Sequence, residues 1–421
     1  MLDRLLADTF PYFLEQTNPE NGLIADKTKP DSPSSIAVVG FGLSVYIIGV
    51  ERGLISREEA AKKTLTILRF FYNSKQGRGK FATGYKGFYY HFLHMKTGER
   101  TWNSELSTMD TALFITGALS SACYFVEKNK EEKEIRELAD ALYKRIDWQW
   151  ALNKKKSITH GWKPESGFMR RHWDKHFSEA HLLYFLALGS PTFPIDPSIY
   201  PRWTDSFEWK KFYGIEYTYS GPLFIHQFLH LWLDMKGLKD DYCRRTGIDY
   251  FENARRATLI HQEYAKDNPG DFLQYSELSW GLSASDGPGP FSKVINGKKR
   301  VFYDYKARGA PLGPDDGTLS PWAVVASLPF APEIVLPAMR NDTERLNLHD
   351  PRIYGLKASF NPTYVQKDKD QLGWVSMWQF GLNEGPVIMM IDNFQTGFLW
   401  KLMKSCSYLE KGIRLAGFRK K

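Results

Sequence analysis

The chain has 421 residues, 43% of them hydrophobic, and a formal net charge of +8. Its basic runs form no nucleic-acid-binding motif, and Lys and Glu mix over much of the sequence, so the charge indicates solvated faces rather than a nucleic-acid-binding surface. Three cysteines without a CxxC pair argue against a disulfide framework or a structural zinc site, and no run reaches the ~18 apolar residues of a membrane span. The first residues do not form a signal peptide, so we expect a soluble chain, either cytoplasmic or a mature form whose targeting segment has been removed.

Helical periodicity dominates the first part of the chain. Apolar residues recur at helical spacing over residues 2–15, and residues 36–50 form an apolar run that contains three glycines. Small residues in an apolar helix indicate close packing against its neighbours, as expected of an inner helix. Ser56 and Glu59 form a capping box, which predicts that a helix begins there and continues to about residue 72.

The remaining predicted helices alternate between apolar and amphipathic. They cover residues 107–125, 131–151, 179–188, 223–236, 250–267, 318–327, 330–339 and 385–402. Apolar helices are buried on most sides, whereas amphipathic helices cover a core with one face. About a dozen such helices fit this length, which predicts an all-α fold, an (α/α)6 barrel of six helical hairpins in two concentric rings.

Strand-like segments are few, and the chain has no linker rich in Pro, Gly or Ser. Residues 80–90, 294–305 and 357–364 are expected to form short β hairpins or loops over the barrel mouth. The absence of a linker predicts a single domain over residues 1–421.

Aromatic residues make up 15% of the chain, and several stand beside carboxylates at predicted helix starts. Aromatic faces stack on sugar rings, and carboxylates perform acid and base chemistry on a glycosidic oxygen. The pattern therefore favours a carbohydrate-cleaving cleft. A large aromatic core would explain the same composition.

Two carboxylates have the clearest case for such a cleft. Asp110 stands in the first turn of an apolar helix, where free backbone N–H groups favour a negative charge, and Glu105 precedes it. Glu179 precedes an apolar helical run and follows Trp173 and His176, so an apolar wall is expected to raise its pKa as a general acid requires. Helix capping is the alternative for both Asp110 and Glu179.

Two later segments offer further candidates. Trp280 precedes a loop of small residues that contains Asp286, which suits a turn that contacts a ligand, although an Asx turn at Asp286 is equally compatible. His226 and Gln227 place polar groups on an apolar helix. His226 and His230 have the i, i+4 spacing of a metal pair, but no third ligand is nearby, so hydrogen bonds to sugar hydroxyls are the preferred interpretation. No phosphate-binding glycine loop and no GxSxG nucleophile elbow is present.

Taken in chain order, these motifs resemble the glycoamylase-like domain, which includes the endo-β-1,2-glucanases of glycoside hydrolase family 144 and their relatives. The resemblance extends over nearly the whole chain. It rests on residues 87–93, 105–113, 179–191, 226–228, 280–288, 316–321, 327–333, 360–363 and 385–400.

The resemblance implies an (α/α)6 barrel that cleaves a glucan, above all a β-1,2-linked one, through a carboxylate pair and without a metal or other cofactor. Family 144 enzymes invert the anomeric configuration, and a relative transglycosylates with retention. Asp110 and Glu179 fall on the positions of cleft carboxylates, and Asp286 and Asp316 fall in motifs that line the same cleft.

The chain departs from the family pattern at three places. His94 stands where an Asp is expected, and Asn383-Glu384 replaces an Asp-Gln pair. Ser107 stands where an acid precedes Asp110 in the family, which leaves Glu105 as the nearby carboxylate.

These observations lead to one hypothesis with two alternatives. We expect a glycoside hydrolase, endo-acting on β-1,2-glucan, with Glu179 as general acid and Asp110 or Asp286 as the group that activates water, in an inverting reaction. The alternatives are a non-catalytic carbohydrate-binding or sensing protein on the same scaffold, and a transglycosylase or phosphorylase. The expected partner is an oligo- or polysaccharide, with no nucleic acid and no membrane span. The residues expected to bind it are Trp102, Trp173, Trp280, Tyr90, His226, Gln227, Arg100, Glu105 and Asp316.

Overall fold

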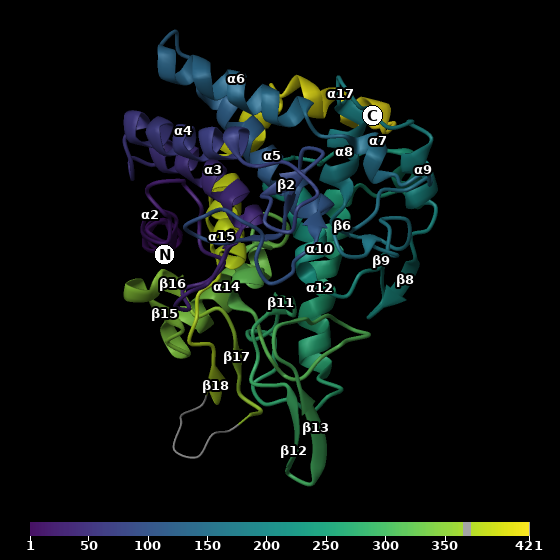
Figure 1. The fold of residues 1–421 in the computed structure, drawn as a ribbon. Helices are drawn as coiled ribbons and strands as arrows, with labels where there is room; N and C mark the ends of the chain where they lie inside the picture. Colours follow the sequence, from purple (N-terminus) through teal and green to yellow (C-terminus); the bar gives the residue numbers. More distant parts are fainter. Residues whose placement is uncertain (365–371, 421) are drawn as a thin grey trace.

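The computed structural model describes residues 1–364 and 372–420 of a largely helical protein (Figure 1). The helical fold class predicted from the sequence is thereby confirmed. The helices are α1 (Leu2–Thr9), α2 (Tyr12–Glu15), α3 (Ile36–Glu51), α4 (Arg57–Asn73), α5 (Thr108–Tyr124), α6 (Lys130–Lys144), α7 (Trp148–Ala151), α8 (His181–Gly189), α9 (Ile199–Thr204), α10 (Leu223–Gln227), α11 (Asp241–Thr246), α12 (Tyr250–Asp267), α13 (Pro321–Val325), α14 (Pro332–Arg340), α15 (Gly381–Gln395), α16 (Phe398–Met403) and α17 (Ser407–Leu415).

The apolar helices form the interior of the molecule. Helix α3 is buried along nearly its whole length and packs against α5 and α15, which are also largely buried. Gly40 and Gly117 lie at the α3–α5 contact, where a Cβ atom on Gly117 would lie 2.0 Å from the carbonyl oxygen of Gly40. Only glycine permits this approach, so the glycines of the apolar run do pack tightly, as predicted.

Amphipathic helices cover this interior. Helix α4 packs against α3 and α6, and α6 packs against α5 (Figure 1). The Ser56 hydroxyl accepts a hydrogen bond from the backbone N–H of Glu59 at 3.1 Å, so the predicted cap of α4 is present. One cluster of buried apolar residues extends from Leu5 to Phe418. Among the described residues, no helix is long and apolar enough to cross a membrane.

Several predicted helices are shorter than expected because Pro, Gly or a cap residue interrupts them. Pro11 separates α1 from α2, and Gly397, at φ +61°, separates α15 from α16. The Asp147 side chain caps α7, so the expected helix 131–151 is divided into α6 and α7. Helix α10 ends at Gln227 and continues as a 3-10 turn over Phe228–Leu231.

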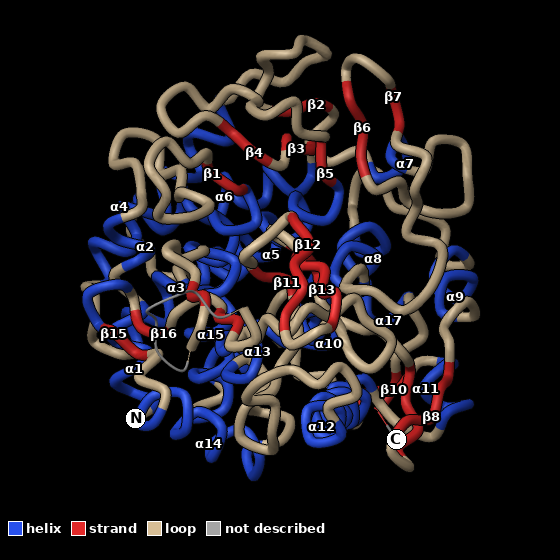
Figure 2. Tube along the Cα trace, turned by 90° about the horizontal axis from the view of Figure 1, so that it is seen from below, coloured by secondary structure: helices blue, strands red, loops and turns tan. Residues whose placement is uncertain are grey.

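The strands are short, and the named strands pair in antiparallel fashion over the described residues. The largest sheet has the order β2-β3-β5-β6-β7 and leads from β5 directly into α5, with Tyr89 opposite Ser107 and Leu106 opposite Trp162. The β12–β13 hairpin projects from the helical body (Figure 1) and lies across the middle of the helices in Figure 2. The strands are β1 (Ser34–Ser35), β2 (Gly84–Tyr85), β3 (Phe88–Tyr90), β4 (Phe92–Leu93), β5 (Leu106–Ser107), β6 (Gly161–Lys163), β7 (Gly167–Phe168), β8 (Trp209–Phe212), β9 (Ile215–Thr218), β10 (Leu238–Lys239), β11 (Ala284–Ser285), β12 (Phe291–Ile295), β13 (Lys298–Phe302), β14 (Lys306–Ala307), β15 (His349–Asp350), β16 (Gly355–Leu356), β17 (Phe360–Asn361), β18 (Trp374–Val375) and β19 (Arg419–Lys420).

Candidate active site

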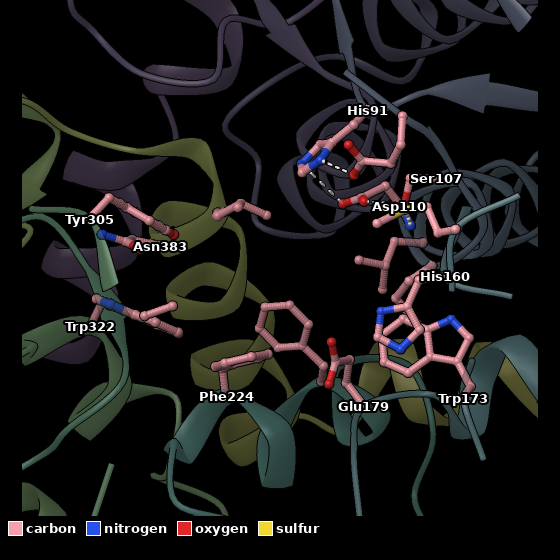
Figure 3. A pocket seen from close by; sticks show the side chains of 17 residues that line it. His91, Ser107, Asp110, His160, Trp173, Glu179, Phe224, Tyr305, Trp322 and Asn383 are labelled. Carbon is pink, nitrogen blue, oxygen red and sulfur yellow. Dashed lines mark hydrogen bonds and ion pairs between the residues drawn. The ribbon is translucent and has the colours of Figure 1, made fainter. Parts of the chain in front are cut away.

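A cavity of ≈ 290 Å³ lies among the starts of the inner helices (Figure 3). Carboxylates and histidines lie on one side of it, and Tyr305, Trp322 and Asn383 gather on the other. Segments far apart in the sequence therefore meet here. The lining residues are His91, Glu105, Ser107, Met109, Asp110, Leu113, His160, Met169, Trp173, Glu179, Phe224, Phe228, Ala284, Tyr305, Trp322, Leu382 and Asn383.

Asp110 is positioned by the junction between β5 and α5. Ser107 ends the strand and caps the helix, and its hydroxyl accepts a hydrogen bond from the Asp110 backbone N–H at 3.1 Å. The same hydroxyl donates to Asp110 Oδ2 at 2.5 Å. The Asp110 carboxylate therefore sits at the positive end of the helix dipole and faces the cavity.

His91 joins the two carboxylates on this side of the cavity. Its Nδ1 lies 3.0 Å from Glu105 Oε1, and its Nε2 lies 3.7 Å from Asp110 Oδ1. Burial disfavours the charged ring, but Asp110 and Glu105 outweigh burial and raise the pKa of His91 to about 9. Burial likewise opposes ionisation of Glu105, yet the bond from His91 lowers the pKa of Glu105 to about 2. At neutral pH the group is an imidazolium held between two carboxylates.

These three side chains are also the one group among the described residues whose ligand atoms, all within 4.8 Å of one another, could hold a metal ion. The hydrogen bond and ion pairs of the protonated His91 account for their geometry. A metal would have to displace that proton, because a histidine binds metals through a neutral ring nitrogen.

Glu179 lies in the segment just before α8 and faces the cavity from there. The N-cap of α8 is Ala180, so Glu179 does not cap the helix. Burial raises the pKa of Glu179 to about 7, and the negative charge of Asp110 contributes to this rise. The carboxyl therefore keeps its proton in a large fraction of molecules at neutral pH, as a general acid must.

Two rings support this wall. Trp173 stacks on His160 with ring centroids 3.8 Å apart, and the Trp173 indole donates to the Thr108 hydroxyl at 3.1 Å. Burial, followed by the nearby Arg171, lowers the pKa of His160 to about 4, so this ring is neutral. The wall beside Glu179 is thus aromatic and uncharged.

The far wall carries buried polar groups without partners. Both side-chain atoms of Asn383, Nδ2 and Oδ1, and the indole Nε1 of Trp322 have no hydrogen-bond partner among the described residues. Asn383 is 1% exposed and Trp322 is 3% exposed. Unpaired buried polar groups are costly, so groups that line a cavity in this state are suited to bind a polar ligand.

Other predicted site residues lie away from the cavity lining. Asp286 accepts a hydrogen bond from the Ser376 hydroxyl at 3.0 Å, and burial raises its pKa. Asp316 forms a fully buried ion pair with Arg308, with Nε and Oδ1 2.6 Å apart. Both carboxylates therefore have protein partners in this structure, and Asp316 does not line the cavity.

Five further residues predicted to bind sugar pack inside the protein or pair with its groups. His226 bonds the Ser220 carbonyl at 3.1 Å, and Gln227 donates to Ala323 and Ser327. The sequence pattern missed the partners of Gln227 because they come from a distant segment. Trp280 and Tyr90 are buried, and Arg100 forms a two-bond pair with Glu165 at 2.6 and 3.1 Å.

Trp102 is the opposite case, since it is 58% exposed and lines a separate depression. Asp110, Glu105, Glu179 and Trp173 are the predicted residues that the structure brings into one cavity. Sequence reasoning did not assign roles there to His91, His160, Tyr305, Trp322 or Asn383. The sequence pointed to two of them. His91 lies in a motif that carries the family resemblance, and Asn383 differs from the residue expected in another such motif.

Comparison with known proteins places this geometry in a family. Residues 171–407 match the family described as "Glycoamylase: Putative glucoamylase". The chain belongs to this glycoamylase family. The structure of a "putative glucoamylase" from Bacteroides uniformis superposes with a TM-score of 0.86 at 31% identity, over 100% of this chain and 97% of that one.

Two relatives of this glycoamylase-family chain carry a stated activity. An endo-β-1,2-glucanase from Chitinophaga pinensis, in complex with sophorotriose and glucose, is 26% identical with a TM-score of 0.83, over 99% of this chain and 97% of that one. An exo β-1,2-glucooligosaccharide sophorohydrolase from Parabacteroides distasonis is 28% identical over 98% of this chain. The chain spans 57% of the length of that relative.

Proposed function

We propose that this chain is a glycoside hydrolase that cleaves β-1,2-linked glucan or gluco-oligosaccharides in the cavity between Asp110 and Glu179. The observation that carries the proposal is the contrast between these carboxyls. Glu179 has a pKa raised to about 7, whereas Asp110 is bonded by Ser107 and paired with the cationic His91. Two carboxyls with different environments are what acid and base catalysis of glycoside cleavage requires. The β-1,2 linkage is proposed from the stated activities of the two relatives.

The proposed reaction is a single displacement with inversion. Protonated Glu179 gives its proton to the glycosidic oxygen as the bond from that oxygen to the anomeric carbon breaks. A water molecule forms the new bond to the anomeric carbon and gives a proton to Asp110. Asp110 is preferred over Asp286 as the base, because Asp110 lines the cavity and Asp286 is bonded to Ser376. The Glu105–His91 pair holds Asp110 in place and needs no metal ion or other cofactor in this scheme.

Recognition of the sugar is proposed for the aromatic and amide walls. Trp173 offers a ring face beside Glu179, and Asn383 and Trp322 offer unpaired groups to sugar hydroxyls. An amide both donates and accepts, so Asn383 can bind a hydroxyl in either role. The Asp that the family pattern has at this position would, when ionised, only accept hydrogen bonds.

The scaffold proposed for this chemistry is one (α/α)6 barrel formed by residues 1–421. Support comes from the buried α3, α5, α8 and α15, from the amphipathic α4 and α6 outside them, and from the larger apolar cluster, which joins both ends of the described chain. The expected strands fall in short hairpins, of which β12–β13 lies across the middle of the helices in Figure 2.

The deciding experiment is product analysis on a panel of linear glucans that includes β-1,2-glucan and short β-1,2-gluco-oligosaccharides. Release of mixed short products from the polymer is expected, with the anomeric configuration inverted in the first product formed. Release of the disaccharide alone would indicate exo action, and phosphate-dependent or lengthened products would indicate a phosphorylase or a transglycosylase. Binding without cleavage of any glucan would contradict the hydrolase and leave a sugar-binding protein.

A further inference from the structure

A second depression, of ≈ 710 Å³, has a lining separate from that of the candidate active site. It is formed by residues 15–20, 25 and 27–33 and by residues 94–96, 101 and 102. Its charged lining is balanced, because three lysines face three carboxylates. These are Lys27, Lys29 and Lys96, and Glu15, Glu20 and Asp31. Such a surface suits a neutral polar ligand better than an anion such as a nucleic acid.

Trp102 is the most unusual residue of this depression. It occupies a tight turn closed by the Ser104 N–H donating to the Thr101 carbonyl at 3.0 Å. Both central residues have left-handed backbone, with φ +54° at Trp102 and +49° at Asn103. Turns of this kind are favourable with Asn-Gly, whereas a bulky residue at the first central position is strained. The indole is also 58% exposed, so the turn presents a large apolar ring to water at a conformational cost.

The turn is fixed from beneath. Arg100 bonds Glu165 through both terminal nitrogens and donates from Nε to the Ser104 carbonyl at 2.6 Å. The Thr101 N–H donates to the Phe92 carbonyl at 3.0 Å. The Phe92 ring lies 5.0 Å from the Trp102 ring. The backbone of the turn and the contact with Phe92 therefore constrain the indole before any ligand arrives, which lowers the entropic cost of binding.

An aromatic path connects this turn to the candidate active site. His91 lines the cavity and stacks on Phe92, with centroids 4.0 Å apart and an interplanar angle of 13°. Phe92 in turn contacts Trp102. A sugar chain that leaves the cavity past His91 would thus meet the exposed indole after a short distance.

We propose that the Trp102 depression binds glucosyl residues of a long substrate chain outside the catalytic cavity, with one ring stacked on the indole. The inference rests on the proposed function for the β-1,2 linkage of the glucan. It adds a binding site that a polymer can reach and a short oligosaccharide cannot. The depression is the preferred site because it joins a rigid aromatic platform to a polar, charge-balanced lining.

The test compares Trp102→Ala and Trp102→Gly with Trp209→Ala, which removes another exposed indole, on β8. The readout is kcat/KM on long β-1,2-glucan divided by kcat/KM on the shortest β-1,2-gluco-oligosaccharide that is cleaved. Both Trp102 variants are expected to lower this ratio by about fivefold to tenfold through a higher KM for the long chain, and Trp209→Ala to leave it unchanged. Trp102→Gly also relieves the left-handed strain, so it should unfold at a temperature no lower than the wild type does.

An unchanged ratio in the Trp102 variants, or an equal loss on short and long substrates, would overturn the proposal. If the wild type cleaves no β-1,2-glucan, the proposed function fails. The Trp102 site is then tested by the binding of long glucans. Binding of long linear glucans would be measured by calorimetry with Glu179→Gln and with Glu179→Gln/Trp102→Ala. Weaker binding of any long glucan by the double variant supports the Trp102 site, whereas equal binding or no binding overturns it.

Discussion

The hydroxyl of Ser107 lies 2.5 Å from a carboxylate oxygen of Asp110 and donates a hydrogen bond to it. Because Ser107 also caps α5 through the Asp110 N–H, one side chain begins the helix and orients the carboxylate. A neutral hydroxyl therefore donates to the carboxylate that lines the cavity.

This arrangement predicts how Ser107 variants behave. Ser107→Asp keeps a capping group but places a second negative charge beside Asp110, so the acidic limb of the kcat/KM profile should move to higher pH. Ser107→Ala removes both bonds and should lower kcat and destabilise the fold by about 1 kcal/mol. Steady-state profiles and thermal unfolding would measure these effects. An unchanged acidic limb in Ser107→Asp would contradict the assignment of Asp110 as base.

Glu179 should set the alkaline limb of activity. Its pKa is raised to about 7, so the proton that the leaving group needs is present below that pH and is lost as the pH rises through it. We expect kcat/KM to fall above about pH 7, and Glu179→Gln to lose about 10²–10⁴-fold in kcat. The exposed Glu277 offers a matched control, since Glu277→Gln changes the same chemical group elsewhere and should leave the profile as it is. Full activity of Glu179→Gln would exclude it as the acid.

Substitution of Asn383 is expected to lower activity and raise stability. Its amide has no hydrogen-bond partner in the described part of the chain, so Asn383→Leu should raise the free energy of unfolding by about 1 kcal/mol and lower kcat/KM by at least tenfold. Asn393 lies on the same helix but donates to the Leu231 carbonyl at 2.9 Å, so Asn393→Leu should destabilise the protein. Denaturant unfolding and kinetics on both variants test the contrast. A loss of stability in Asn383→Leu would show that the amide has a structural partner.

The Arg308–Asp316 pair should prove essential to the fold rather than to catalysis. Both side chains are fully buried, so Arg308→Met leaves Asp316 without its counter-ion and should cost about 3–5 kcal/mol. The double variant Arg308→Met/Asp316→Leu should recover part of that loss. Arg69→Met, which breaks an exposed pair with Glu134, should cost about 1 kcal/mol or less. Urea unfolding of the four proteins would measure these differences, and equal losses from Arg308→Met and Arg69→Met would refute the argument.

The sequence predicted features that depend on local pattern. Helical periodicity and the capping box identified α3 and α4, and the helix-start position and apolar surroundings singled out Asp110 and Glu179. These signals are local because a carboxylate at the start of a helix lies wherever the N-terminus of that helix lies, and the helix start can be recognised from neighbouring residues alone.

Features that depend on distant partners could not be predicted in this way. Gln227 looked free on an apolar helix, but its partners Ala323 and Ser327 lie about a hundred residues later. Arg100 is likewise occupied by Glu165, and Trp102 is exposed where a cavity contact was expected. A polar residue on an apolar helix gives the same sequence pattern whether its hydrogen-bond partner is another part of the protein or a ligand.

The walls of the cavity come from opposite ends of the chain, which has a consequence for how the site can be divided. The matched family segment, 171–407, carries Glu179 and Asn383, whereas His91 and Asp110 precede it. A polypeptide limited to that segment would retain the proposed proton donor, Glu179, and lose the proposed base, Asp110. It would also lose α3 and α5, against which α15 and α8 pack. Complementation of that segment by a polypeptide of residues 1–170 would therefore depend on rebuilding the packing of α15 against α3 and of α8 against α5 before any chemistry could return.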